Sequence, residues 1–256
     1  MGSVLTEKAC NRLDRLTSGL MFIAKTRDAA DAFMNQLKNR TIRKQYIARV
    51  RGEFPEYLLP PPTLILPNRL TFARGEAVCD QPILQISPKL GLNRVKAEGK
   101  HAKTLFRRLR YNAEKHYSIV ECHPFTGRTH QLRVHLQFLG HPVANDPIYC
   151  NRKVFGINLG KGGEGDDEDI ITRLGRMGKT EVAEAEAYHE EIVDEHQRRK
   201  AEKLTGELCD KCRTPLYSDP GPHELGIYLH ARRYECEEGA WSYETALPDW
   251  ALEGGE

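Results

Sequence analysis

Hydrophobic and polar residues alternate in several short segments of this chain. In KQYIARVRG, Tyr46, Ala48 and Val50 share one face, and this pattern predicts a half-buried strand closed by Gly52. HYSIVECHP is expected to form another strand, and apolar alternation predicts strands at GIYLHARRY and WSYETALP. Residues 20–24 are apolar without alternation and follow a Thr-Ser-Gly turn, which predicts a strand buried on both faces inside a sheet.

Two longer segments follow a helical period instead. TRDAADAFMNQLKNR places apolar residues four apart behind the candidate N-caps Thr26 and Asp28, so a helix is expected there. TGRTHQLRVHLQFLGHP has leucines at helical spacing, and Gly140 and Pro142 are expected to end that helix.

The remaining segments suggest how the chain is organised. Residues 55–67 hold five prolines, which exclude a helix or a central strand and predict a connection along the surface. LGKGGEGDDEDI is rich in glycine and acids and is expected to be flexible, and Thr180 opens a segment with the charge order of a long, solvated helix. We therefore divide the chain into a core at 1–150, an acidic insertion at 151–224 and strands at 225–256 that rejoin the core.

Composition narrows the class of protein. The 256 residues are 39% hydrophobic and contain no stretch of eighteen apolar residues, so we expect no membrane span. The segment MGSVLTEKAC resembles neither a secretory signal nor a transit peptide. Seven cysteines without small-domain spacing favour a reducing compartment, and we expect a cytoplasmic protein with a nuclear or mitochondrial pool allowed.

Charge is unevenly distributed along the chain. The first 160 residues hold 26 Lys and Arg against 12 Asp and Glu, whereas the remaining 96 hold 12 against 24. A basic half of this size is typical of proteins that bind nucleic acid, since neutralised phosphates release counterions. The alternative is that these Lys and Arg residues only form a solvated surface and bind no nucleic acid.

Four motifs in order bring the chain to a known family. NRLDRLTSG, KQYIARVRGEFP, PFTGRTHQLRVHLQFLGHPVANDPIY and LHARRY resemble the RluA-type RNA pseudouridine synthases, most closely the eukaryotic, fungal branch that acts on tRNA. The resemblance covers residues 10–150 and 225–250. It implies a mixed α/β (α+β) fold, with a largely antiparallel sheet, a basic cleft and an acidic, partly disordered insertion, and it makes residues 1–150 the catalytic core.

The resemblance also gives Asp14 a role. By itself, a carboxylate between Arg12 and Arg15 fits a surface salt bridge equally well. Pseudouridine formation, an isomerisation that needs no cofactor and no metal, requires one ionised carboxylate, either as nucleophile or as the base that starts an elimination. Asp14 corresponds to that carboxylate.

Two further catalytic residues follow from the same motifs. Arg133 in HQLR corresponds to the family's arginine that orients the carboxylate and favours its charge, and Arg128 is the alternative for that pairing or a phosphate contact. Tyr46 corresponds to the active-site tyrosine, whose ring can stack on a flipped uracil and whose hydroxyl can assist proton transfer.

Other motif residues are expected to contact the RNA. Arg12 corresponds to the residue that fills the space left by the flipped uridine. Thr17, Arg128 and His130 are expected to contact the substrate, and Asn11, where the family usually has His, is assigned no role.

Only thirteen residues precede Asp14, whereas the family carries an upstream strand and a Lys-Pro turn. An N-terminal part of the core is thus expected to be missing and a sheet edge beside residues 20–24 to be open.

Two alternatives compete with this interpretation. CDKC at Cys209 and Cys212 is half of a structural zinc site, which Cys236, His223 or His230 could complete. The chain could also be a catalytically inactive RNA-binding remnant of the same family, although the presence of the catalytic carboxylate favours an enzyme. We expect a monomeric RNA isomerase whose partner is RNA, tRNA above all, with no membrane contact.

Overall fold

The computed structural model describes residues 8–55, 70–73, 76–176, 204–208, 210, 213, 215–217 and 226–252. Except for residue 55, the expected surface connection at 55–67 lies outside the described residues. The long helix expected from Thr180 begins outside them as well, as do Cys209 and Cys212 of the zinc hypothesis.

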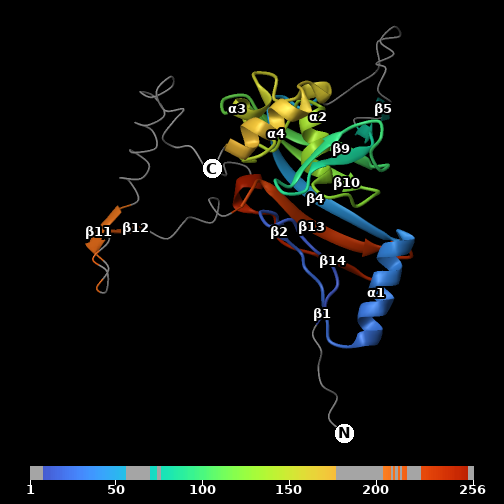
Figure 1. The fold of residues 1–256 in the computed structure, drawn as a ribbon. Coiled ribbons are helices and arrows are strands. Elements are labelled where there is room, and N and C mark those ends of the chain that lie inside the picture. Colours follow the sequence, from blue (N-terminus) through green and yellow to red (C-terminus); the bar gives the residue numbers. More distant parts are fainter. Residues whose placement is uncertain are drawn as a thin grey trace, which may run out of the picture.

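An eight-stranded sheet organises the described part of the chain (Figure 1). Seven strands follow one another as antiparallel neighbours, and an eighth, β2 (Ser18–Gly19), pairs in parallel with β13. The order is β14 (Ser242–Glu244), β13 (Leu229–Cys236), β4 (Ile42–Arg51), β10 (Tyr117–Pro124), β9 (Lys103–Asn112), β6 (Glu76–Asp80) and β5 (Leu70–Ala73). The expected α+β fold with a largely antiparallel sheet is confirmed.

The other described elements are short ribbons and helices. The ribbons pair β1 (Lys8–Ala9) with β3 (Ile23–Ala24), β7 (Ile83–Ser87) with β8 (Leu92–Val95), and β11 (Leu204–Leu208) with β12 (Pro215–Tyr217). The helices are α1 (Arg27–Asn39), α2 (Gln131–Phe138), α3 (Arg152–Phe155), α4 (Asp167–Arg176), and the 3₁₀ turns η1 (Lys161–Gly163) and η2 (Asp249–Ala251).

Both helices expected from the periodic pattern are present. The Thr26 hydroxyl accepts a hydrogen bond from the Ala29 amide at 3.2 Å and caps α1, so Thr26 rather than Asp28 is the N-cap. All eight residues of α2 are buried, and Gly140 follows with φ +89°, a conformation that glycine adopts without strain.

The sheet has a covered layer on each face near the site. Ala48 and Val50 of β4 share a buried cluster with Leu136 of α2, whereas Ile47 packs on the opposite face with Trp250 of η2. The strand expected to be half-buried is therefore covered on both faces at its centre. Buried side chains on both faces thus hold β4 between α2 and η2.

The expectation of a buried strand at residues 20–24 is wrong. Ile23 of β3 is 58% exposed, and among the described strands β3 pairs only with the short β1. The backbone beside β13 is instead paired by β2, where Gly19 is required because a Cβ there would collide with the Ala231 carbonyl oxygen. The run was misread because its apolar residues divide between solvent and an aromatic cluster that includes Phe22, Phe33 and Trp241.

The expectation that residues 159–170 are flexible is also wrong. Arg94 of β8 is buried and donates hydrogen bonds to the carbonyls of Gly163 and Glu164 and to the Asp167 carboxylate. Ile170 of α4 is buried in a core cluster with Val134 of α2, among others. The acids that suggested disorder lie at the start of α4, where they suit a helix N-terminus.

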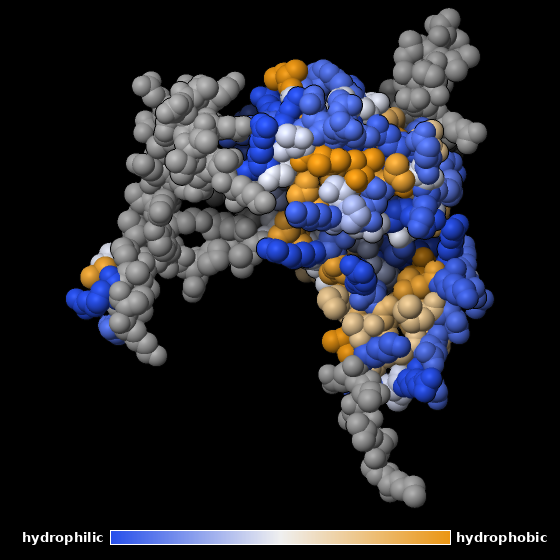
Figure 2. All heavy atoms as spheres, in the orientation of Figure 1, coloured by the Kyte–Doolittle hydropathy of each residue, from blue (hydrophilic) through white to orange (hydrophobic). Residues whose placement is uncertain are grey.

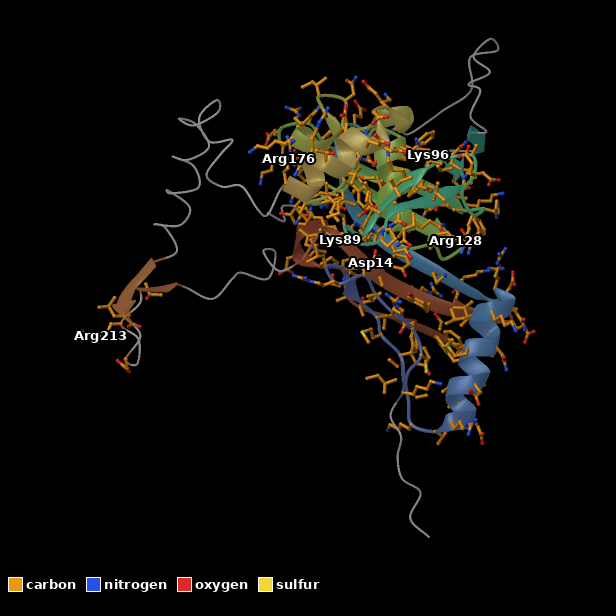
Figure 3. The ribbon with its side chains drawn as sticks, viewed as in Figure 1. Asp14, Lys89, Lys96, Arg128, Arg176 and Arg213 are labelled. Atoms are coloured by element: carbon orange, nitrogen blue, oxygen red, sulfur yellow. The ribbon has the colours of Figure 1, made fainter. Side chains whose placement is uncertain are left out.

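The surface is mostly hydrophilic in the view of Figure 2, with hydrophobic residues gathered in a band in the upper part and in a second group below it. Asp14 lies in the middle of the molecule, between α1 and the region of α2 to α4 (Figure 3). The expected division into core, insertion and C-terminal strands remains a prediction.

Candidate active site

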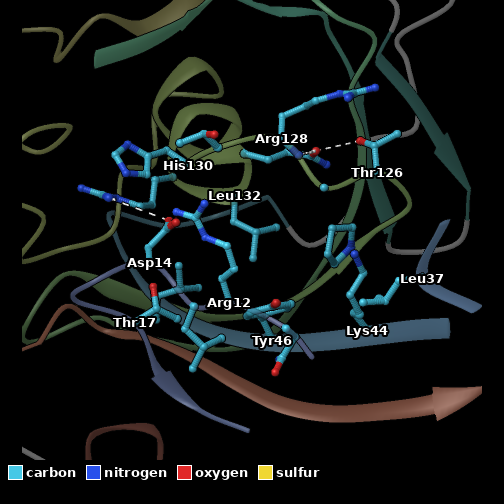
Figure 4. Close-up of a pocket in the computed structure, with 18 of the residues that line it drawn as sticks. Arg12, Asp14, Thr17, Leu37, Lys44, Tyr46, Thr126, Arg128, His130 and Leu132 are labelled. Carbon is cyan, nitrogen blue, oxygen red and sulfur yellow. Dashed lines mark hydrogen bonds and ion pairs between the residues drawn. The ribbon is translucent and has the colours of Figure 1, made fainter. Parts of the chain in front are cut away.

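A cavity of about 390 Å³ opens between the segment after β1, the end of α1, β4 and the start of α2 (Figure 4). All seven residues expected from the sequence to be catalytic or to contact substrate line this one cavity, although they come from three separate segments of the chain. They are Arg12, Asp14, Thr17, Tyr46, Arg128, His130 and Arg133.

The loop that carries Asp14 is held by backbone contacts and by Asn11. The Thr17 amide donates to the Asp14 carbonyl at 2.8 Å, which closes a turn. The Asn11 side chain donates to the Leu20 carbonyl at 3.2 Å and accepts from the Phe22 amide at 2.8 Å. Asn11, which received no role from the sequence, therefore fixes the loop and leaves the Asp14 side chain 30% exposed in the cavity.

Arg133 faces Asp14 but is held by a different carboxylate. Its Nε and Nη2 donate to Asp146 at 2.6 and 2.9 Å, and both side chains are buried. Its Nη1 lies 3.9 Å from Asp14 Oδ2. Burial alone would lower the pKa of Arg133, but the hydrogen bonds and charge of Asp146 outweigh it and raise that pKa. The guanidinium is thus permanently charged and fixed, with one nitrogen directed at Asp14.

His130 lines the cavity next to Arg133 and contacts the buried Tyr149. His130 precedes α2 in a left-handed conformation, φ 57°, and its Nδ1 lies 3.0 Å from the Tyr149 hydroxyl. Burial and the charge of Arg133 lower the pKa of His130, so its imidazole is neutral near pH 7. The Tyr149 ring lies 4.9 Å from the centre of the Arg133 guanidinium.

Tyr46 projects from β4 into the cavity with its hydroxyl paired. Its oxygen lies 2.6 Å from the hydroxyl of Tyr234 on β13. Burial raises the pKa of Tyr46 well above its ordinary value, and Tyr234 and the nearby Asp14 raise it further. The phenol therefore keeps its proton at neutral pH.

The other end of the cavity is basic. Arg128 donates from Nε to the His101 carbonyl at 2.9 Å, so it does not replace Arg133 as the arginine facing Asp14. Lys44 lines the same end, and burial, with a smaller effect of Arg40, lowers its pKa. Asp14 and His130 lie at one end of the view in Figure 4, with Lys44 and Arg128 toward the other.

Sequence reasoning missed four residues of this site. Asp146, Tyr149, Lys44 and Tyr234 either line the cavity or fix a residue that does. Asp146 and Tyr149 stand in the quoted motif HPVANDPIY, so the signal was present. Spacing could not reveal that Asp146 pairs with Arg133, because the contact depends on how the chain returns beside α2.

The zinc hypothesis stays a prediction, since Cys209, Cys212 and His223 lie outside the described residues. Among the described residues, no group of three His, Cys, Asp or Glu side chains could hold a metal ion. Both ring nitrogens of His230 lie within hydrogen-bond distance of hydroxyls, those of Ser18 and Thr245, at 2.8 and 2.7 Å. In the described part of the chain no helix has the length and apolar character needed to cross a bilayer.

The chain is similar to several known proteins. A family model described as RNA pseudouridylate synthase matches residues 5–138. The mitochondrial tRNA pseudouridine(32) synthase of Saccharomyces cerevisiae is 46% identical over 254 residues, covering 95% of this chain and 49% of that protein. The tRNA pseudouridine(31) synthase of the same yeast is 34% identical over 251 residues, covering 94% of this chain and 58% of that protein.

A solved structure shares the fold. Human RNA Pseudouridylate Synthase Domain Containing 1 superposes with a TM-score of 0.52 at 21% identity, covering 98% of this chain and 72% of the human one. The chain spans about half the length of the curated relatives it matches. Because the family model matches more than half of the chain and these relatives match nearly all of it, the chain belongs to the RNA pseudouridylate synthase family.

Proposed function

We propose that this chain converts uridine to pseudouridine in RNA, with Asp14 as the catalytic carboxylate. The observation that carries the proposal is the position of Asp14, which projects into a basic cavity with its carboxylate 3.9 Å from a buried, permanently charged Arg133. Membership of the family supports the reaction.

The reaction is an isomerisation in which atoms are neither gained nor lost. The bond between ribose C1′ and uracil N1 breaks, the base turns, and a new bond joins C1′ to C5. The proton on C5 leaves and N1 gains one, so no oxidant or reductant is needed. The Asp14 carboxylate either attacks C1′ as nucleophile or removes a ribose proton as base, and both roles require it in its ionised form.

Arg133 supplies a fixed positive charge at the carboxylate. The fork formed by its Nε and Nη2 is hydrogen-bonded to Asp146, and Nη1 is the group that faces Asp14. A charge that is already oriented before the substrate binds costs no reorganisation during the reaction. We assign Arg133 the electrostatic role and Asp146 the positioning of Arg133.

Tyr46 acts with its proton in place. Its aromatic ring lines the cavity where a flipped base would lie, and its hydroxyl shares a hydrogen bond with Tyr234. A protonated phenol can donate a hydrogen bond to a uracil oxygen or pass on a proton during the turn of the base.

Binding requires the uridine to leave its stack. Arg12 is exposed on the rim and is assigned to the space that the flipped base vacates. The buried hydroxyl of Thr17 makes no hydrogen bond to another described residue, and it lines the cavity together with His130. Both are assigned to the nucleotide, and Arg128 to a phosphate.

Transfer RNA is the proposed substrate class. Two similar yeast proteins carry names that specify a tRNA position, and the first 160 residues carry a large excess of basic side chains. We also propose that the chain is a monomer and is cytoplasmic, although one of those relatives is named mitochondrial. Light scattering of the purified chain and imaging of a fluorescent fusion would test these two statements.

Asp14→Asn tests the function, because it keeps the side-chain shape and removes the charge. We expect tRNA affinity within about threefold of wild type, and tritium release from RNA labelled at uracil C5 to disappear. Asp28→Asn, at an exposed carboxylate in the first turn of α1, is the matched control and should retain turnover. Wild-type turnover in Asp14→Asn would exclude the assignment, and an inactive wild-type chain that binds tRNA would support the RNA-binding remnant.

A further inference from the structure

Phe125 is an exposed aromatic side chain that the proposed reaction leaves without a role. It is 52% exposed and lies in the loop between β10 and α2. Its chain neighbours Pro124 and Thr126 both line the cavity. In Figure 4 Thr126 lies at the end of the cavity away from Asp14. If the reacting uracil lies at the Asp14 end, a ring beside the other end is too far away to contact it. That ring would lie closer to a neighbouring nucleotide of the same RNA.

The backbone that carries Phe125 is fixed on both sides. The Phe125 amide donates to the Lys103 carbonyl at 3.0 Å, and the Lys103 amide donates to the Thr126 hydroxyl at 3.0 Å. Gln131 of α2 is buried, donates to the Lys103 carbonyl at 3.0 Å and accepts from the Thr126 hydroxyl at 2.7 Å. The loop therefore presents its aromatic ring to solvent on a rigid support, as a preorganised binding group requires.

The surroundings of the ring carry positive charge. Lys103 Nζ lies 5.7 Å from the centre of the Phe125 ring, within cation–π range. Arg128, three residues along the loop, is oriented by its hydrogen bond to the His101 carbonyl. The nearby carboxylate of Asp80 lies 3.0 Å from His101 Nε2. An exposed aromatic ring with one cation beside it and a second on the same loop matches a nucleobase with its phosphate better than an apolar protein surface.

We propose that Phe125 is a stacking platform for a base next to the isomerised uridine, with Lys103 and Arg128 at the adjoining phosphate. The inference rests on the proposed function, since it takes the Asp14 end of the cavity as the place of the reacting base. It adds a positioning residue that acts on the unreacted part of the RNA.

Binding is measured first in the Asp14→Asn chain, so that the RNA is not converted, with an unmodified yeast tRNA transcript as the probe. Removing one stacked base contact with Phe125→Ala should raise Kd by roughly 5- to 150-fold. Phe125→Trp should restore affinity, and Phe125→Leu, which is apolar but not aromatic, should not. Ile157→Ala removes another exposed apolar side chain, 73% exposed and in the loop after α3, and should leave Kd unchanged.

Steady-state kinetics and 2-aminopurine fluorescence then test whether Phe125 acts on binding and which nucleotide it contacts. With Asp14 intact, Phe125→Ala should raise KM and retain kcat within about threefold, the opposite of the Asp14→Asn result. With 2-aminopurine placed on either side of the target uridine, the wild-type ring should quench one of the two probes and Phe125→Ala should relieve that quenching. Equal Kd for Phe125→Ala and wild type, or full affinity in Phe125→Leu, would overturn the platform. Neither result would affect the test of Asp14.

Discussion

Replacing Asp146 with Asn removes the only negative charge in direct contact with the fork of Arg133 among the described residues. The Asp146 side chain is fully buried and accepts from Arg133 at 2.6 and 2.9 Å. It also accepts from the amides of Ile148 and Tyr149 at 2.9 and 3.0 Å. An Asn can keep part of this hydrogen bonding, but the buried guanidinium loses its hydrogen-bonded counter-charge and keeps only Asp14, 3.9 Å from Nη1.

The cost can be worked from that geometry. Breaking a buried ion pair by removing one partner costs about 3–5 kcal/mol of unfolding free energy, because the remaining charge stays desolvated without the partner that compensated it. For a folded unit of about 150–250 residues, each kcal/mol moves Tm by about 2–4 °C. We therefore expect Tm of Asp146→Asn to fall by about 6–20 °C.

Turnover should fall as well, since Arg133 loses the contact that directs Nη1 at Asp14. We expect the rate of tritium release to drop more than tenfold below the melting range, with little change in tRNA affinity. Arg133→Lys keeps the charge but cannot form the fork, and it should show the same kinetic change.

Calorimetry and tritium release on the same preparations provide the assay. Asp169→Asn is the matched control, because its carboxylate forms an exposed ion pair with Arg173 at 3.4 Å and such pairs contribute less than about 1 kcal/mol. A wild-type Tm and rate in Asp146→Asn would refute the reasoning. Intact turnover with weakened RNA binding in Arg133→Lys would move Arg133 to the RNA contacts.

Three further outcomes are expected. If about four phosphates are neutralised by the basic cleft, the log–log salt slope of tRNA binding should be roughly −3 and affinity should fall about 50-fold between about 50 and 200 mM salt; salt-independent binding would contradict this. Burial lowers the pKa of His135 to about 4, against weaker opposing effects of the Gln81 carbonyl and Asp80. As pH falls, this imidazole therefore takes up its proton in the unfolded chain before it does so in the folded one. The free energy of unfolding should decrease by about 3 kcal/mol between about pH 6.5 and about pH 4. Urea titrations should measure this decrease in the wild type and not in His135→Gln. Residues 160–208 are acidic, so their charge alone gives no reason to expect that deleting them weakens RNA binding. The deletion should nevertheless lower Tm, because it removes the carbonyl and carboxylate partners of buried Arg94. An unchanged Tm would show that this packing is dispensable.

The sequence determined the elements whose signals are local. The start of α1 is encoded by Thr26 within three residues of the amide that it caps. The end of α2 is encoded by Gly140. The strands β4 and β13 follow from alternation over a few positions. Ordered motifs likewise pointed to Asp14, Tyr46 and Arg133, which the fold brings to one cavity.

The tertiary structure alone decided the partners of these residues. Arg133 could be expected to face Asp14, but its fork belongs to Asp146, thirteen positions along the chain. Residues 20–24 are as apolar as a buried strand, yet β13 is paired by β2 instead. The acids around Asp167 suggested disorder until Arg94, more than seventy positions earlier, supplied a buried partner. Periodicity and capping act within one or two turns of chain, whereas an ion pair or a strand partner depends on which distant segments the fold places together.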